Sequence, residues 1–268
     1  MKKAFTIIIS ISLLTIVHSG CKKSDREDQK DITTAIDNAE AQNVFDGIWR
    51  EISELVDSSI TIRSSCAAVT ISSYNPSVWP KITTIDYGTT NCLGTDGNNR
   101  RGKVIASFSK KYSDSNTVIN VSFDNFIHND QLVEGIITIT NKGKNTTGNY
   151  IFNLKVQNAV IHTSIGKLFW SANQTREWIS GKSTPNYVAD DIYLVTGTSA
   201  GTSLAGNSFS SIIDIPLRIE PTCTWTSMGS VNVYPKNYSV INVNYGNGTC
   251  DNVATAIINK KATEILLL

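Results

Sequence analysis

The sequence predicts an all-β protein with one helix near its N-terminus. Beyond residue 66, apolar and polar residues alternate with a period of two, which is typical of strands with one buried and one wet face. Short clusters of Asn, Asp and Gly separate these runs, and this spacing indicates an antiparallel meander. The chain has 268 residues, which is enough for one large β domain.

The helix is predicted over residues 33–57. Val44, Phe45, Ile48 and Ile52 recur at spacings of three and four, so they share one apolar face. A preceding threonine is a suitable N-cap. An amphipathic helix of this kind is expected to lie across a sheet.

The strands are predicted within a single domain over residues 58–268. Clear alternation occurs in residues 119–123, 150–156 and 241–245. About a dozen such runs follow one another, joined mostly by short turns. A two-layer sandwich and an incompletely closed barrel both fit this meander.

Two segments that end in cysteines, 66–92 and 223–250, resemble each other. In both, Pro-Lys lies upstream and Tyr-Gly stands just before the second cysteine. This internal repeat predicts a duplicated hairpin unit, and equivalent units are expected to close equivalent loops. It therefore favours disulfides that join Cys66 to Cys92 and Cys223 to Cys250, with four buried free thiols as the alternative.

The first 20 residues have the features of a secretory leader. Two lysines precede an apolar stretch of 14 residues, Ala4 to Val17, which is too short to span a bilayer comfortably. Small residues then precede Cys21, so residues 1–20 are predicted to be a lipoprotein signal and Cys21 to carry acyl chains such as palmitate. The alternative is an ordinary cleaved signal followed by a free thiol. Residues 21–32 are highly charged and are expected to form a solvated tether.

Three motifs support a family resemblance. They are Asp86-Tyr87-Gly88 ahead of Cys92, the block Thr175-Arg176-Glu177-Trp178, and the closing residues 245–252, YGNGTCDN. With the predicted lipidated cysteine, they resemble a group of Bacteroidota envelope lipoproteins. That group has no assigned activity, so the resemblance implies a location and a fold class and carries over no catalytic residue.

Charge and motif content argue against several function classes. The 24 basic and 23 acidic residues nearly cancel, so nucleic acid is not an expected partner. His128 and His162 are the histidines beyond the leader, and neither belongs to a recognisable nucleophile motif. We expect no catalytic residue, no cofactor and no metal site.

The most distinctive polar and aromatic pair is Arg176 with Trp178. Residues two apart share a strand face, so a guanidinium and an indole could together hold a sugar or a carboxylate. The alternative is an ordinary strand pair, or a tryptophan packed into the core.

The function that these observations favour is a non-enzymatic scaffold, lipid-anchored at the outer membrane. Its partner would be an envelope protein, a glycan or a lipid. Acidic residues behind Cys21 favour display at the cell surface, with a periplasm-facing position as the alternative. A carrier with an apolar ligand in a β cavity, resembling lipoprotein carriers or lipocalin-like barrels, is the second hypothesis. A hydrolase that uses two carboxylates is the third.

Overall fold

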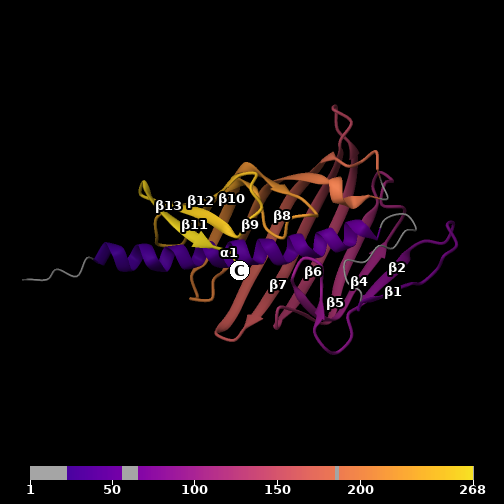
Figure 1. Cartoon of the computed structure of the whole chain (residues 1–268), viewed down its shortest axis with the longest axis horizontal. Helices are drawn as coiled ribbons and strands as arrows, with labels where there is room; N and C mark the ends of the chain where they lie inside the picture. The colour runs from indigo at the N-terminus through magenta and orange to yellow at the C-terminus, as the bar shows by residue number, and fades with distance from the viewer. Residues whose placement is uncertain (1–22, 56–65, 185–186, 268) are drawn as a thin grey trace, which may run out of the picture.

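The computed structural model describes residues 23–55, 66–184 and 187–267. They form one helix, one short 3-10 turn and fourteen strands (Figure 1). The all-β class predicted from the alternation of apolar residues is confirmed. The predicted leader 1–20 and the predicted lipidation site Cys21 lie outside the described residues.

The helix α1 (Lys23–Glu54) begins ten residues earlier than the sequence pattern predicts. From Lys23 onward, the residues expected to form a tether belong to this helix. The physical reason is that neither glycine nor proline occurs between Cys21 and Gly47. Charged side chains such as Lys, Glu and Arg are good helix formers even without an apolar face.

All fourteen strands belong to one sheet. They are β1 (Ala68–Ile71), β2 (Lys81–Asp86), β3 (Cys92–Leu93), β4 (Asn99–Phe108), β5 (Val118–His128), β6 (Gln131–Lys144), β7 (Tyr150–Thr163), β8 (Gly166–Ser180), β9 (Ile192–Thr202), β10 (Ser208–Ile219), β11 (Met228–Pro235), β12 (Ile241–Asn247), β13 (Val253–Ile258) and β14 (Lys261–Leu266). The 3-10 turn η1 (Val188–Asp190) lies between β8 and β9.

The topology is a meander in which each strand pairs antiparallel with its neighbour in the chain. The small strand β3 is the exception, since it pairs with β4 beside the main path. Among the described strands, β1 and β14 form the two edges, and the sheet is not closed into a barrel. One sheet rather than two excludes the sandwich, so the incompletely closed barrel is the architecture found.

The helix lies against the concave side of this sheet and crosses several strands (Figure 1). Phe45 stacks on Trp170 of β8 with ring centroids 5.2 Å apart. Trp49 meets Phe152 and Tyr193 edge-on at 5.4 and 5.6 Å. These rings form the centre of the core, and aromatic pairs at such distances stabilise beyond the apolar area they bury.

The helix is buried on its polar side as well as on its apolar side. Nearly every side chain from Thr34 to Glu54 is buried. The predicted apolar face is therefore not the only buried face, because a sheet this wide curves around the helix. Its buried polar residues include Asp37, Asn38, Gln42, Asp46 and Glu51.

The predicted repeat appears as two antiparallel hairpins, β1–β2 and β11–β12. Each is closed at its open end by a disulfide, Cys66–Cys92 in the first and Cys223–Cys250 in the second. The cysteines are 26 and 27 positions apart. The pairing predicted from the repeat is confirmed.

The Tyr-Gly motif has the same local structure in both hairpins. The Gly88 N–H donates to the Asp86 side chain at 2.9 Å, and the Gly246 N–H donates to the Asn244 side chain at 2.8 Å. Both glycines have positive φ, +76° and +84°, which few other residues adopt without strain. The shared motif is therefore a shared turn that leads each chain toward its second cysteine.

Candidate functional site

The predicted patch of Arg176 and Trp178 lies inside the molecule. Both belong to β8 and share its inner face, as the period of two predicts, but their exposed fractions are 0 % and 8 %. The Trp178 Nε1–H donates to the Asp191 carboxylate at 3.0 Å. The arrangement leaves neither side chain on the surface, and a ligand role for the pair stays a prediction.

Arg176 instead contacts the helix. Its Nη2 forms an ion pair with Asp46 Oδ1, and its guanidinium lies over the Trp49 ring at 4.8 Å from the centroid. Gln42 Nε2 donates to the same Asp46 oxygen at 2.8 Å, and Gln174 Nε2 donates to Gln42 Oε1 at 2.5 Å. These residues form a polar cluster in the middle of an aromatic core, which we call the Arg176 cluster.

The Arg176 cluster is incompletely satisfied. Asp46 Oδ2 and the Nε and Nη1 of Arg176 are buried without a hydrogen-bond partner among the described residues. A buried ion pair gives little net stability, but removal of one partner leaves a buried unpaired charge. The cluster therefore fixes where the helix sits more than it strengthens the fold.

A second polar cluster surrounds Arg100 at the C-terminal part of the helix. Arg100 Nε pairs with Glu51 of the helix at 2.8 Å, and its Nη1 and Nη2 contact both oxygens of Asp96 at 2.9 and 2.5 Å. Tyr87 donates its hydroxyl proton to Glu51. Burial alone would raise the pKa of Asp96, but the hydrogen bonds and the charge of Arg100 hold that pKa well below its usual value.

His128 lies beside this cluster and is buried. Burial, followed by the positive charge of Arg100, lowers its pKa from 6.5 to about 4. The ring is therefore neutral at physiological pH, which suits a structural residue. His162 lies on the outer side of the sheet, with its Nε2 at 2.6 Å from Glu134.

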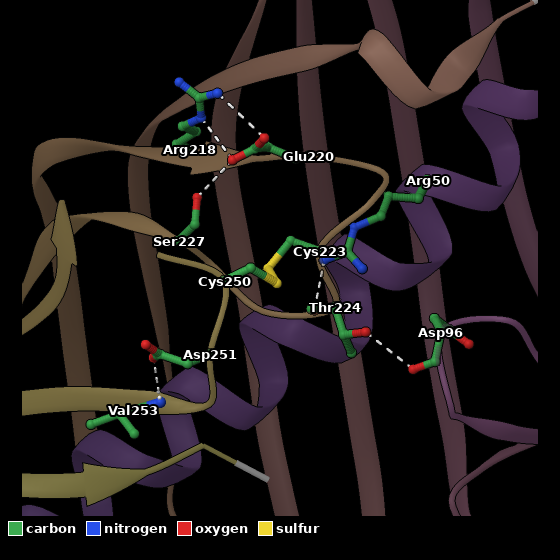
Figure 2. The surroundings of a disulfide bond; sticks show 10 residues. All are labelled: Arg50, Asp96, Arg218, Glu220, Cys223, Thr224, Ser227, Cys250, Asp251 and Val253. Carbon is green, nitrogen blue, oxygen red and sulfur yellow. Dashed lines mark hydrogen bonds and ion pairs between the residues drawn. A yellow bond between two sulfur atoms is a disulfide. The ribbon is translucent and has the colours of Figure 1, made fainter. Parts of the chain in front are cut away.

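The second disulfide loop contacts both the helix and the loop that contains Asp96. Arg50 Nη2 donates to the carbonyl oxygen of Thr224 at 2.9 Å, and Thr224 Oγ1 donates to the carbonyl oxygen of Asp96 at 3.1 Å. Figure 2 shows Thr224 next to Cys223, between the helix and the Asp96 loop. The loop after β3 and the loop after β10 thus meet across the helix, although the strands do not close the barrel.

A third polar contact fixes the N-terminal part of the buried helix. Asn38 Oδ1 accepts hydrogen bonds from Trp170 Nε1 at 3.1 Å and from Ser199 Oγ at 2.8 Å. The preceding residue is Asp37, whose Oδ2 accepts from the backbone N–H of Leu204 at 2.8 Å. The helix is held by polar contacts along its buried length.

The buried Asp37 should make the free energy of unfolding depend on pH. Burial raises its pKa to about 6, against the lowering effect of the Leu204 hydrogen bond. The folded state therefore favours the protonated carboxyl. The contribution of Asp37 to the free energy of unfolding is complete below about pH 4 and is lost as the pH rises through about 6. Asp37→Asn should raise the free energy of unfolding by about 2 kcal/mol near pH 7.5 and by almost nothing near pH 4. Urea unfolding at the two pH values measures this, and an equal gain at both would contradict the assignment.

Among the described residues, no group of three or more His, Cys, Asp or Glu side chains is placed to hold a metal ion. In the same part of the chain, no helix is long and apolar enough to cross a membrane. Comparison with protein-family models, with curated proteins and with solved structures gives no match.

Sequence reasoning missed the partners of Arg176. A usable signal existed, because Gln174 and Arg176 have the same parity on β8 as the buried Leu168, Trp170 and Ala172. That parity places both polar side chains on the inner face. Asp46 carried no comparable signal, since its burial depends on how far the sheet curves around the helix.

Proposed function

We propose that this protein is a lipid-anchored binding scaffold of the bacterial cell envelope. The observation that carries the proposal is the position of α1, which starts two residues after Cys21 and then fills the concave side of the sheet. A helix of 32 residues is about 48 Å long. One continuous element would thus connect the acylated cysteine to the core of the folded domain.

A continuous helix of this kind would hold the domain rigidly relative to its anchor. In Figure 1 the N-terminal part of α1 projects beyond the sheet on the side of β13, whereas the C-terminal part ends near β2. Its buried part is fixed by the Arg176 cluster, by Arg100 and by Asn38. An anchor at Cys21 would hold the sheet away from the membrane in a defined orientation, and this favours function through outward-facing loops.

The proposal is tested by the attachment of the lipid. The full chain, produced in a Gram-negative host fed with labelled palmitate, should carry the label and sediment with membranes. Cys21→Ser should lose the label and leave the membrane fraction. Cys250→Ser is the matched control, because it removes another cysteine and should keep the label. An unlabelled wild-type chain, or a label that survives Cys21→Ser, would contradict the anchor.

The second candidate is a carrier, and one observation favours it. The orphaned nitrogens of Arg176 and the orphaned Asp46 oxygen make the contact between helix and sheet less complete than an apolar one. If the helix moved away, the concave face would offer Arg176 among Trp170, Phe152 and Tyr193 to an amphipathic anion. Native mass spectrometry of the full chain decides this, since a carrier should release a reproducible small molecule on denaturation.

A further inference from the structure

One end of the sheet carries a row of lysines. In a meander alternate connections share an end, so the β1–β2, β4–β5, β6–β7 and β8–β9 connections lie at one end of their strands. The lysines at this end form what we call the lysine rim, which consists of Lys81, Lys110, Lys111, Lys142, Lys144 and Lys182. All but Lys81 are exposed, and Lys81 is half-buried.

The contacts of the described residues bring these connections together. Lys81 of β2 pairs with Phe108 of β4, and Phe108 is two residues before Lys110. The end of β6 touches the β4–β5 connection, where the Asn116 N–H donates to the Asn141 carbonyl at 2.8 Å. Lys182 reaches from the β8–β9 connection to Asn149 in the β6–β7 turn, at 2.5 Å. The lysines therefore form one row across adjacent hairpins.

Neighbouring acids balance this row only in part. Among the described residues, none of the six lysines forms an ion pair. Of the carboxylates nearby, Glu177 accepts from Asn145 and Asn149, and Asp190 accepts from Thr184. Asp114 is exposed in the same connection as Lys110 and Lys111. Together with the buried Asp191, four carboxylates lie near the six lysines, so this end keeps an excess of positive charge.

Aromatic side chains accompany the lysines. Lys81 Nζ lies 4.9 Å from the centroid of the Trp79 ring, and Lys144 Nζ lies 4.8 Å from that of Tyr150. These contacts hold two ammonium groups in place. Tyr74 and Tyr187 have exposed fractions of 78 % and 61 %, and they offer ring faces to a ligand.

We propose that the lysine rim binds a linear acidic polysaccharide, with carboxylates on the ammonium groups and sugar rings against Tyr74 and Tyr187. Successive hairpins are two strands apart, so the charges repeat roughly every 10 Å along the rim. A row with such spacing matches an extended polyanion. This inference rests on the proposed anchor only for the outward orientation of the rim.

Three points favour a polysaccharide over other partners. Lysine is depleted in protein–protein interfaces, so a rim of lysines is a poor protein site. In Figure 1 the β1–β2 and β6–β7 hairpins lie far from the N-terminal end of α1, so an anchor at Cys21 would turn the rim away from its own membrane. The tip of the β1–β2 hairpin is also polar, with Ser73, Asn75 and Ser77 between its larger residues.

Binding is tested on the full chain with Cys21→Ser, which removes the acyl attachment point and changes no described residue. The probe is polygalacturonate, with dextran as the neutral polymer. The wild-type surface should bind polygalacturonate, bind dextran much more weakly, and lose affinity as salt rises. The rim variant combines Lys110→Gln, Lys111→Gln and Lys142→Gln and should lose about 10-fold or more in affinity.

The matched control combines Lys155→Gln, Lys167→Gln and Lys236→Gln, three exposed lysines outside the rim. It changes the net charge equally and should keep most of the affinity. Salt screens the charge contacts but not the contacts between sugar rings and tyrosine rings. The double variant Tyr74→Ala with Tyr187→Ala should therefore weaken the binding that remains at high salt. Circular dichroism shows whether each variant is folded.

Equal losses in the rim and control variants, or no polygalacturonate binding, would overturn the proposal. So would binding to phosphatidylglycerol vesicles without binding to polygalacturonate, which would assign the rim to a membrane. Unchanged binding by the double tyrosine variant at high salt would overturn the sugar-stacking part. Because the test uses a chain without its lipid, its failure is independent of the palmitate result.

Discussion

Arg176→Met should lower the free energy of unfolding by about 3–5 kcal/mol, because it leaves Asp46 as an unpaired charge in the core. The two side chains have exposed fractions of 0 % and 1 %, so water cannot replace the lost partner. Urea unfolding of the full chain with Cys21→Ser measures the change. The effect should be among the largest of any single substitution in the protein.

The matched control is Arg101→Met, which breaks the exposed pair with Asp130. These side chains are 28 % and 69 % exposed, so the loss should stay below about 1 kcal/mol. Arg176→Met combined with Asp46→Leu removes both charges and should recover most of the stability lost by Arg176→Met alone. A double variant as unstable as the single one would show that the pair stabilises the fold directly.

Loss of the second disulfide should have the next largest effect. The chain-entropy model gives about 3.5 kcal/mol for a loop of 27 residues, and Cys223→Ser with Cys250→Ser removes that constraint. The neighbouring Thr224 also contacts Arg50 of the helix and the backbone of Asp96 (Figure 2). We therefore expect faster amide hydrogen exchange in the helix around Arg50, besides a lower free energy of unfolding.

The first disulfide provides the comparison. Cys66→Ser with Cys92→Ser opens a loop of almost the same length, so the chain-entropy contribution is the same within error. Cys66 stands before the edge strand β1, so its loss should expose less of the helix. Equal exchange around Arg50 in both variants would contradict a special role for the second loop.

Local pattern determined much of this protein. The alternation of apolar residues in β5, β7 and β12 predicted strands because each strand has one buried face, and short turns predicted their antiparallel order. The repeated Tyr-Gly motif predicted the disulfide pairing, since both copies form the same turn before a cysteine. These features depend on residues close in the sequence.

The candidate site depended on tertiary structure. Residues on β8 were correctly placed on one face, but whether that face meets solvent or the helix is decided by the curvature of fourteen strands. The lysine rim likewise joins residues from four separate hairpins, and contacts between those hairpins bring the lysines into one row.

The sequence by itself determined the strands, their antiparallel succession, the core helix and the pairing of cysteines, because periodicity and turn chemistry act over a few residues. Only the tertiary structure decided that the helix is buried on all sides, that Arg176 pairs with Asp46, and that the barrel stays open. Burial of the polar helix face follows from how far a wide sheet curves, and that curvature is summed over all its strands.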